Sequence, residues 1–342
     1  MGCFPSSPKQ LKNPNSGDNG HHDASGTNVN HPHHQPLQPF REYAFAELRE
    51  ATHGFASRYM ISKGGGELPT LTFRGRLDGG QQIVVKRISK YAWPDEEKFR
   101  EAAIKAGRIR HRRLARLIGY CCQGDARILV AEFMPNDSLA KRLFNGTKNK
   151  TMEWSMRLRV ACYIAEVLEY CINERQALYF DLNLNKVLFD KVDNPCLSSF
   201  GLVKNHRNGK YYSTNIAYTP PECIMGVFNW KSMIFSFGIL LRDLLSGNKV
   251  SESQAIDVIL GKEFPIVLDS RLNGEYSSEE ATALVEIAEE CMQYKPIFRF
   301  NINEVIAALA QVQNNPAGPS NGMPLTEWQD KIHSALVNSD AR

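Results

Sequence analysis

The feature that most constrains the fold of this chain is a change of hydrophobic pattern near Met134. Before it, short runs rich in β-branched residues predict strands at 71–77, 82–88 and 127–133. After it, apolar residues at helical spacing predict longer helices at 154–173, 231–246, 281–292 and 302–312. A small sheet followed by a larger helical half indicates an α+β protein with two lobes around a cleft.

The β-rich part contains its own turn and helix signals. Asp78-Gly79-Gly80 separates two predicted strands and indicates a hairpin. A helix is expected at 99–109, and an earlier one begins at Phe45 and stops at Gly54. We therefore expect the folded domain to cover residues 40–313.

Residues 1–39 are expected to form a disordered, lipid-anchored tail. From Ser7 onward they are rich in Asn, Gly, Ser, Pro, His and Gln and have no apolar periodicity. The chain starts Met-Gly-Cys-Phe-Pro-Ser, which fits the pattern for N-myristoylation at Gly2, and the adjacent Cys3 can carry a second acyl chain. A chance match is the alternative. Two acyl chains hold a membrane stably, whereas one holds it only marginally.

The charge and cysteine content bear on the class of function. The 41 basic and 37 acidic residues give a net charge of +4, which by itself argues neither for nor against nucleic acid. Because no long basic block stands out, no nucleic-acid partner is expected. The eight cysteines lack the spacing of a zinc site and are interpreted as reduced thiols.

Motifs along most of the chain then identify a family. From Tyr43 to Val312 the sequence resembles plant receptor-like cytoplasmic kinases and is most similar to the brassinosteroid-signalling kinase family. The motifs that carry this resemblance are YAFAELREATHGF, VVKRI, YAWPDEEKF, LVAEFMPNDSLAKRLF, MEWSMRLRVA, ALYFDLN, VLFD, SFGL, YSTNIAYTPPE and SFGILLRDLLSG. The resemblance implies a two-lobed protein kinase-like fold, with a small β-rich N-lobe and a larger helical C-lobe.

The same resemblance implies surroundings for the domain. It implies action with receptor kinases of brassinosteroid or immune signalling, and with downstream signalling proteins, at the cytoplasmic face of the plasma membrane. Members of the family usually carry tetratricopeptide repeats after the kinase domain. Here the chain extends only a short way past Pro324-Leu325-Thr326-Glu327-Trp328, so residues 314–342 are expected to form a C-terminal tail in which the repeats are absent or reduced to one helix.

The resemblance also assigns residues to the phosphate-binding parts of a kinase. The three glycine positions of the phosphate loop fall on Gly65, Glu67 and Thr70, so only the first is kept. Lys86 matches the strand lysine that holds phosphates. Its helix glutamate partner aligns with Ala102, and neighbouring Glu101 is about 100° away around the helix. Either the helix rotates to bring Glu101 inward or the ion pair is absent, and we expect the second.

Ala131 matches the residue at the back of the adenine pocket, where a small side chain opens space. The backbones of Glu132 and Met134 would contact the adenine edge. A small residue needed for core packing explains Ala131 equally well. ATP is therefore a candidate ligand, and we expect it to bind weakly.

The catalytic positions have lost most of their usual side chains. Asp181 matches the catalytic base, but Lys186 replaces the metal-binding asparagine and Ser199 replaces the metal-binding aspartate. Because Mg²⁺ prefers carboxylate oxygens, we expect neither Mg²⁺ nor Mn²⁺ to be held here. Phe180 and Asn183 likewise replace an arginine and a lysine that contact phosphates.

Other positions that support a kinase fold are kept. Glu222 and Arg299 match an ion pair at the base of the C-lobe, although Met233 replaces an aspartate beneath the catalytic loop. Ser213 and Thr214 lie in the predicted activation segment and are candidate phosphoacceptors for an upstream kinase.

Three hypotheses of function remain, and the third, a nucleotide-free decoy or allosteric activator, differs from the first only in what it binds. Retained fold supports with lost phosphate and metal contacts favour a pseudokinase that acts as a membrane-anchored signalling scaffold. The alternative is a weak or atypical protein serine/threonine kinase that uses Lys86 and Asp181.

Overall fold

The computed structural model describes residues 39–64, 70–144, 151–204, 206–207, 210–211, 215–262 and 265–314. All of these belong to one unit that starts at Pro39. None of the helices in these ranges has the length and apolar character needed to cross a membrane.

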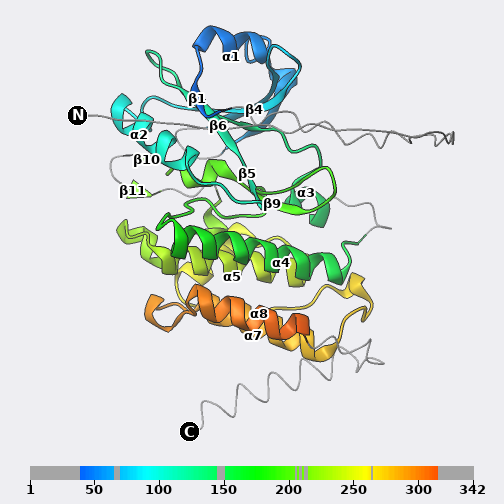
Figure 1. Ribbon diagram of the computed structural model, residues 1–342. Helices are drawn as coiled ribbons and strands as arrows, with labels where there is room; N and C mark the ends of the chain where they lie inside the picture. Colours follow the sequence, from blue (N-terminus) through cyan, green and yellow to red (C-terminus); the bar gives the residue numbers. More distant parts are fainter. Residues whose placement is uncertain are drawn as a thin grey trace, which may run out of the picture. The chain divides into compact units, whose positions relative to one another are not determined.

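A six-stranded sheet forms the first lobe, with strand order β1-β6-β7-β4-β3-β2 (Figure 1). The two edge-proximal strands β1 and β6 are parallel, and the other neighbours are antiparallel. Gly79 and Gly80, both with positive φ, form the turn of the predicted β3–β4 hairpin. The strands are β1 (Arg41–Glu42), β2 (Met60–Lys63), β3 (Leu71–Arg76), β4 (Gln82–Ile88), β6 (Leu117–Cys121) and β7 (Arg127–Glu132).

Two helices pack on this sheet. Helix α1 (Phe45–Ala51) contacts β3 and ends before Gly54, which has φ +74°. Helix α2 (Glu96–Gly107) contacts β6 and β7. It begins three residues before the predicted start because the Asp95 side chain accepts a hydrogen bond from the backbone N–H of Lys98 at 3.1 Å and caps the first turn.

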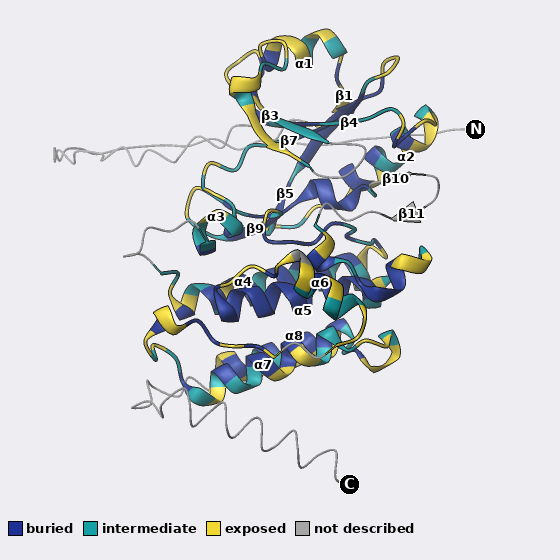
Figure 2. Cartoon of the chain, turned by 180° about the vertical axis from the view of Figure 1, so that it is seen from behind, coloured by how far each residue is buried: buried dark blue, intermediate teal, exposed yellow. Residues whose placement is uncertain are grey.

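The second lobe is mainly helical. Helix α5 is buried along most of its length (Figure 2) and packs against α4 and α7, while α8 packs against α4 and α7. The predicted helix at 154–173 is α-helical as far as Glu169 and continues as a π-helical turn, Tyr170–Glu174. The helices are α3 (Leu139–Phe144), α4 (Trp154–Glu169), α5 (Trp230–Ser246), α6 (Glu252–Ile259), α7 (Ser278–Met292) and α8 (Ile302–Asn314).

Small sheets complete the second lobe. Strands β5 (Leu114–Ala115), β9 (Pro195–Ser198) and β8 (Val187–Phe189) form a three-stranded sheet in that order. Strands β10 (His206–Arg207) and β11 (Lys210–Tyr211) form a two-stranded one. The predicted α+β class with a β-rich lobe and a helical lobe is confirmed.

Candidate functional site

Strand β4 places Lys86 on the inner face of the six-stranded sheet. Ile83 and Val85 belong to the core cluster under α1, and side chains alternate along a strand, so Lys86 lies on the opposite face. Its side chain is 2% exposed. Burial lowers the pKa of Lys86 to about 7, the Lys186 ammonium adds to this effect, and the Asp181 carboxylate opposes it. Lys86, Lys186 and Asp181 therefore share one electrostatic environment.

Asp181 is held by side chains of its own loop. It is 1% exposed, and its Oδ2 lies 3.2 Å from Nζ of Lys186. The Asn183 amide donates to Oδ1 of Asp181 at 3.1 Å. Both oxygens of the carboxylate at the catalytic-base position are thus engaged by the residues that replace the usual phosphate and metal contacts.

Tyr179 fixes this loop against the rest of the lobe. Its hydroxyl donates to the carbonyl of Ser198 at 2.6 Å, and its backbone N–H donates to Sδ of Met233 at 3.3 Å. A thioether is a weak acceptor, so Met233 supports the loop less strongly than a carboxylate would. Gly201 packs against the Tyr179 ring so closely that a Cβ there would lie 2.1 Å from the ring.

Ser199 begins a short 3₁₀ helix, Ser199–Leu202, in the segment that would carry the metal-binding aspartate. It is fully buried, and its Oγ has no hydrogen-bond partner within the described residues. Mg²⁺ prefers an oxygen-rich, anionic ligand set. The two metal-ligand positions instead carry the neutral hydroxyl of Ser199 and the ammonium of Lys186. The described part of the chain also contains no cluster of His, Cys, Asp or Glu suited to a metal ion. The residues present do not fit a metal.

Helix α2 carries an alanine where the resemblance expects a glutamate. Ala102 is half-buried and packs on the main hydrophobic core, whereas Glu101 is exposed. The helix is therefore not rotated so as to bring Glu101 inward. The charged groups that shift the pKa of Lys86 come from the catalytic loop and not from α2.

The segment predicted to contact adenine follows the end of β7. Ala131 is buried and pairs in register with Val84 of β4. The backbone N–H of Glu132 donates to the carbonyl of Arg116 at 3.0 Å, and its Oε1 accepts from the Arg116 backbone N–H at 2.6 Å. Glu132 and Met134 are both partly exposed and lie in the segment before α3. The alanine is small and the carboxylate of Glu132 is used to fix the backbone, while Ala131 also belongs to the main hydrophobic core. That this segment contacts adenine stays a prediction.

Several candidate residues lie outside the described residues. These are Gly65 of the phosphate loop, the lipidation candidates Gly2 and Cys3, and the phosphoacceptor candidates Ser213 and Thr214.

Glu222 and Arg299 form a buried ion pair in the second lobe. Arg299 donates from Nη1 to Oε1 of Glu222 at 2.7 Å and from Nη2 to Oε2 at 2.8 Å. Ser232 of α5 also donates to Oε1, at 2.6 Å. This network ties the segment before α5 to the segment before α8.

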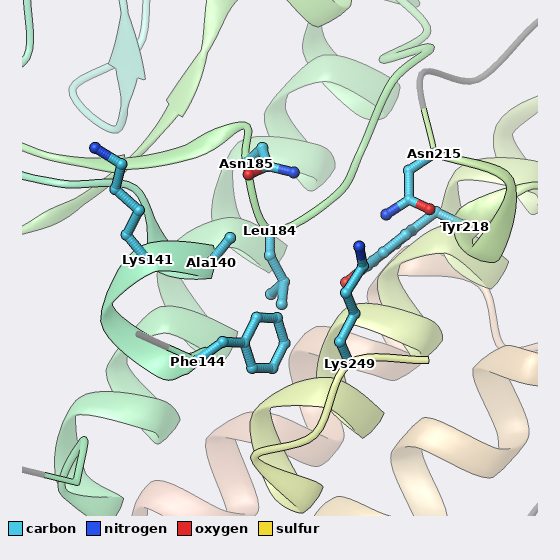
Figure 3. A pocket seen from close by; sticks show the side chains of 8 residues that line it. All are labelled: Ala140, Lys141, Phe144, Leu184, Asn185, Asn215, Tyr218 and Lys249. Atoms are coloured by element: carbon cyan, nitrogen blue, oxygen red, sulfur yellow. The ribbon is translucent and has the colours of Figure 1, made fainter. Parts of the chain in front are cut away.

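The structure also contains a cavity beside the catalytic loop that the sequence did not indicate. It has a volume of about 280 Å³ and lies between α3, the loop and the segment before α5. Figure 3 shows Leu184 and Phe144 pointing toward each other, with Lys141 and Lys249 on opposite sides. No sequence signal links these residues, because they come from different elements and meet only in the folded chain.

Known proteins are similar to this chain in sequence over most of its length. Residues 69–309 match the protein tyrosine and serine/threonine kinase family. The serine/threonine-protein kinase BSK1-2 of Oryza sativa subsp. japonica is 51% identical over 290 residues, which cover 83% of this chain and 55% of the relative. The serine/threonine-protein kinase BSK1 of Arabidopsis thaliana is 51% identical over 285 residues, covering 83% of this chain and 56% of the relative.

A third relative, the serine/threonine-protein kinase BSK2 of Arabidopsis thaliana, is 43% identical over 318 residues, covering 92% of this chain and 64% of the relative. The chain thus spans little more than half the length of the curated relatives it matches. Family membership implies ATP binding, usually with magnesium. The chain belongs to the protein kinase family, and within it the predicted similarity to the brassinosteroid-signalling kinases is confirmed.

Proposed function

We propose that this chain is a membrane-anchored pseudokinase that links plant receptor kinases to downstream signalling proteins. The observation that carries the proposal is the buried contact between Lys186 and Asp181, at 3.2 Å. It puts an ammonium against the carboxylate of the catalytic-base position, and Ser199 supplies only a hydroxyl where a metal ligand is needed. A kinase fold without metal ligands is suited to recognition and not to phosphoryl transfer, which depends on metal ions to position and neutralise phosphates.

ATP binds to this site weakly and without metal in our proposal. Lys86 contacts the phosphates, and the residues around Ala131 hold the adenine. Lys186 supplies a fixed positive charge next to them. Because Lys186 carries its charge next to Lys86 and only one carboxylate lies near the two, an anion bound here stabilises the charged form of Lys86.

A thermal-shift titration with ATP tests this reading. Binding to the native state alone raises the melting temperature by mass action. We expect the same shift in EDTA as with Mg²⁺ or Mn²⁺, and a much smaller shift for Lys86→Met. A shift that requires metal would contradict the proposal. If the melting temperature did not shift under any condition, ATP would be excluded as a ligand and the chain would act as a nucleotide-free scaffold.

Anchoring at the cytoplasmic face of the plasma membrane rests on the first residues of the sequence. Gly2 fits the myristoylation pattern and Cys3 is placed for a second acyl chain. We expect Gly2→Ala to move the full chain from the membrane fraction to the soluble fraction, and Cys3→Ser to weaken attachment, because a single chain binds only marginally. Unchanged fractionation of Gly2→Ala would exclude this anchor.

Regulation by an upstream receptor kinase is proposed at Ser213 and Thr214. Phe180 packs against Phe228 at 5.3 Å between ring centroids, and it stands where an arginine would hold the added phosphate. Phosphorylation is therefore expected to change partner affinity without starting catalysis. The test measures the affinity of the receptor for the variants with alanine or aspartate at both Ser213 and Thr214. Affinities equal to that of the unmodified chain would reject this mode of regulation.

The alternative function is a weak protein serine/threonine kinase. It is favoured by the retention of Lys86 and Asp181 in one buried site and by the similarity to relatives named serine/threonine-protein kinases. The double variant Ser199→Asp, Lys186→Asn restores the usual metal-ligand types. The alternative predicts that the unmodified chain transfers phosphate and that Asp181→Asn abolishes this activity. The pseudokinase proposal predicts no phosphate transfer by the unmodified chain.

A further inference from the structure

A groove lies between α7 and α8, which run side by side on the side of the second lobe away from the sheet (Figures 1 and 2). Its volume is about 270 Å³. Its floor is apolar and includes Ile287 of α7, half-buried Phe300 and Val312 of α8. An apolar floor of this kind suits the apolar face of a helix.

The rim of the groove is acidic. Glu279 and Glu286 are exposed and lie two helical turns apart on the same face of α7. No lysine or arginine of the described residues forms an ion pair with either of them. Glu280 also lines the groove, but its Oε2 accepts a hydrogen bond from Nε1 of Trp154 at 2.8 Å. The groove therefore favours an occupant that is apolar on one face and basic along its edges.

The chain itself carries a segment with that pattern. Beyond α8, apolar residues recur at Leu325, Trp328, Ile332 and Leu336, the spacing of one face of a helix. With about 100° per residue, Lys331 and His333 would flank this face on its two sides. The carboxylates of Glu327 and Asp330 would fall on the opposite face. The apolar face of this segment matches the apolar floor of the groove, and its basic edges match the acidic rim.

The connection between groove and segment is short enough. Helix α8 ends at Asn314, and Gln311 and Val312 in its last turn line the groove. The ten residues 315–324 contain three prolines, which do not continue a helix, and they span at most about 33 Å when extended. The segment can therefore return to the groove within one chain at a high effective concentration.

We propose that residues 325–337 dock as an amphipathic helix in the groove between α7 and α8 of the same chain. The apolar stripe lies on the floor, and Lys331 faces the acidic rim. The proposal concerns a surface other than the nucleotide site and does not depend on whether the chain transfers phosphate.

Hydrogen exchange of the full chain, measured by mass spectrometry at low protein concentration, tests the docking. The rim variant Glu279→Lys, Glu286→Lys alters exposed groove residues and leaves the segment unchanged. We expect exchange in 325–337 to be about tenfold faster in this variant than in the unmodified chain, because docking restricts local opening. The matched control Glu275→Lys changes an exposed glutamate elsewhere and should leave exchange unchanged.

A charge swap adds a second readout. Adding Lys331→Glu to the rim variant should restore part of the protection, whereas Lys331→Glu alone should reduce it. Equal exchange of 325–337 in the unmodified chain and the rim variant would overturn the proposal. Protection that appears only at high concentration, together with a dimer mass, would also overturn it and assign the groove to a second copy.

Discussion

The substitution Glu222→Gln tests how much the second lobe depends on its buried ion pair. The Arg299 side chain is fully buried and that of Glu222 is 8% exposed. All five N–H groups of Arg299 are used: two donate to Glu222, and the others donate to backbone carbonyls of Gln293, Lys231 and Tyr294. Glutamine keeps the size of the side chain but removes the charge, so the guanidinium stays buried without a counter-ion.

The expected cost follows from that burial. Removing one partner of a buried ion pair costs about 3–5 kcal/mol, because the other charge is left uncompensated. At about 2–4 °C per kcal/mol for a domain of this size, the melting temperature should fall by about 6–20 °C. Arg299→Met should cost more still, because it also removes the donors to three carbonyl groups.

Differential scanning calorimetry of the full chain measures the effect, with Glu275→Gln as the control. Glu275 is exposed, so its substitution should change stability by no more than about 0.5 kcal/mol. If Glu222→Gln lowered the free energy of unfolding by less than about 1 kcal/mol, the pair would contribute no more than an exposed ion pair does, and the reasoning from burial would be refuted.

The pH dependence gives an independent check. Burial acts to raise the pKa of Glu222, but hydrogen bonds from Arg299 and Ser232 outweigh it, so the pKa lies below its ordinary value of 4.5. The pair therefore stabilises the fold above the unfolded-state pKa, and this stabilisation is lost as the pH falls through the lower folded-state pKa. Glu222→Gln should remove that part of the acid sensitivity.

Three further predictions concern single residues. The pKa of Lys86 is lowered from 10.5 to about 7, so between these pH values the unfolded chain binds more protons than the folded one. Stability should therefore rise with pH over this range, and Lys86→Met should flatten the rise in melting temperature. Burial raises the pKa of Asp243 from 3.8 to about 6, so its contribution should decline as pH rises through about 6, and urea unfolding of Asp243→Asn should lack this decline. Gly201→Ala should lower the urea midpoint by the equivalent of about 1–3 kcal/mol, because its Cβ would lie 2.1 Å from the Tyr179 ring, and an unchanged midpoint would show that the ring can move.

The fold was predictable where its signals are local. The β3–β4 hairpin follows from the Asp78-Gly79-Gly80 turn between β-branched runs, and the long helices follow from apolar spacing. The β5-β9-β8 sheet was not predicted, since its strands have two to four residues and leave no periodicity to detect. The start of α2 was also missed, because the N-cap at Asp95 comes before the apolar residues that marked the helix.

The candidate site was predictable in its residue types but not in its contacts. The motifs identified Lys186 as a replacement for a metal ligand, but nothing in the spacing said that its ammonium would pair with Asp181 at 3.2 Å. Likewise, the contact between Tyr179 and Met233 joins residues 54 positions apart. Such pairs depend on how the loop packs on α5, which one sequence does not reveal.

The buried charges of the second lobe differ in how they are balanced, and this difference bears on function. Arg157 meets Asp269 at 2.6 Å and Arg299 meets Glu222 at 2.7 Å, each arginine with a carboxylate in direct contact. At the candidate site the Asp181 carboxylate pairs with Lys186, and Lys186 in turn acts to lower the pKa of Lys86. An anion near Lys86 would raise that pKa again and stabilise its charged form. In the proposed pseudokinase the phosphate groups of a nucleotide supply this anion, and the residues that replace the metal ligands account for binding without transfer.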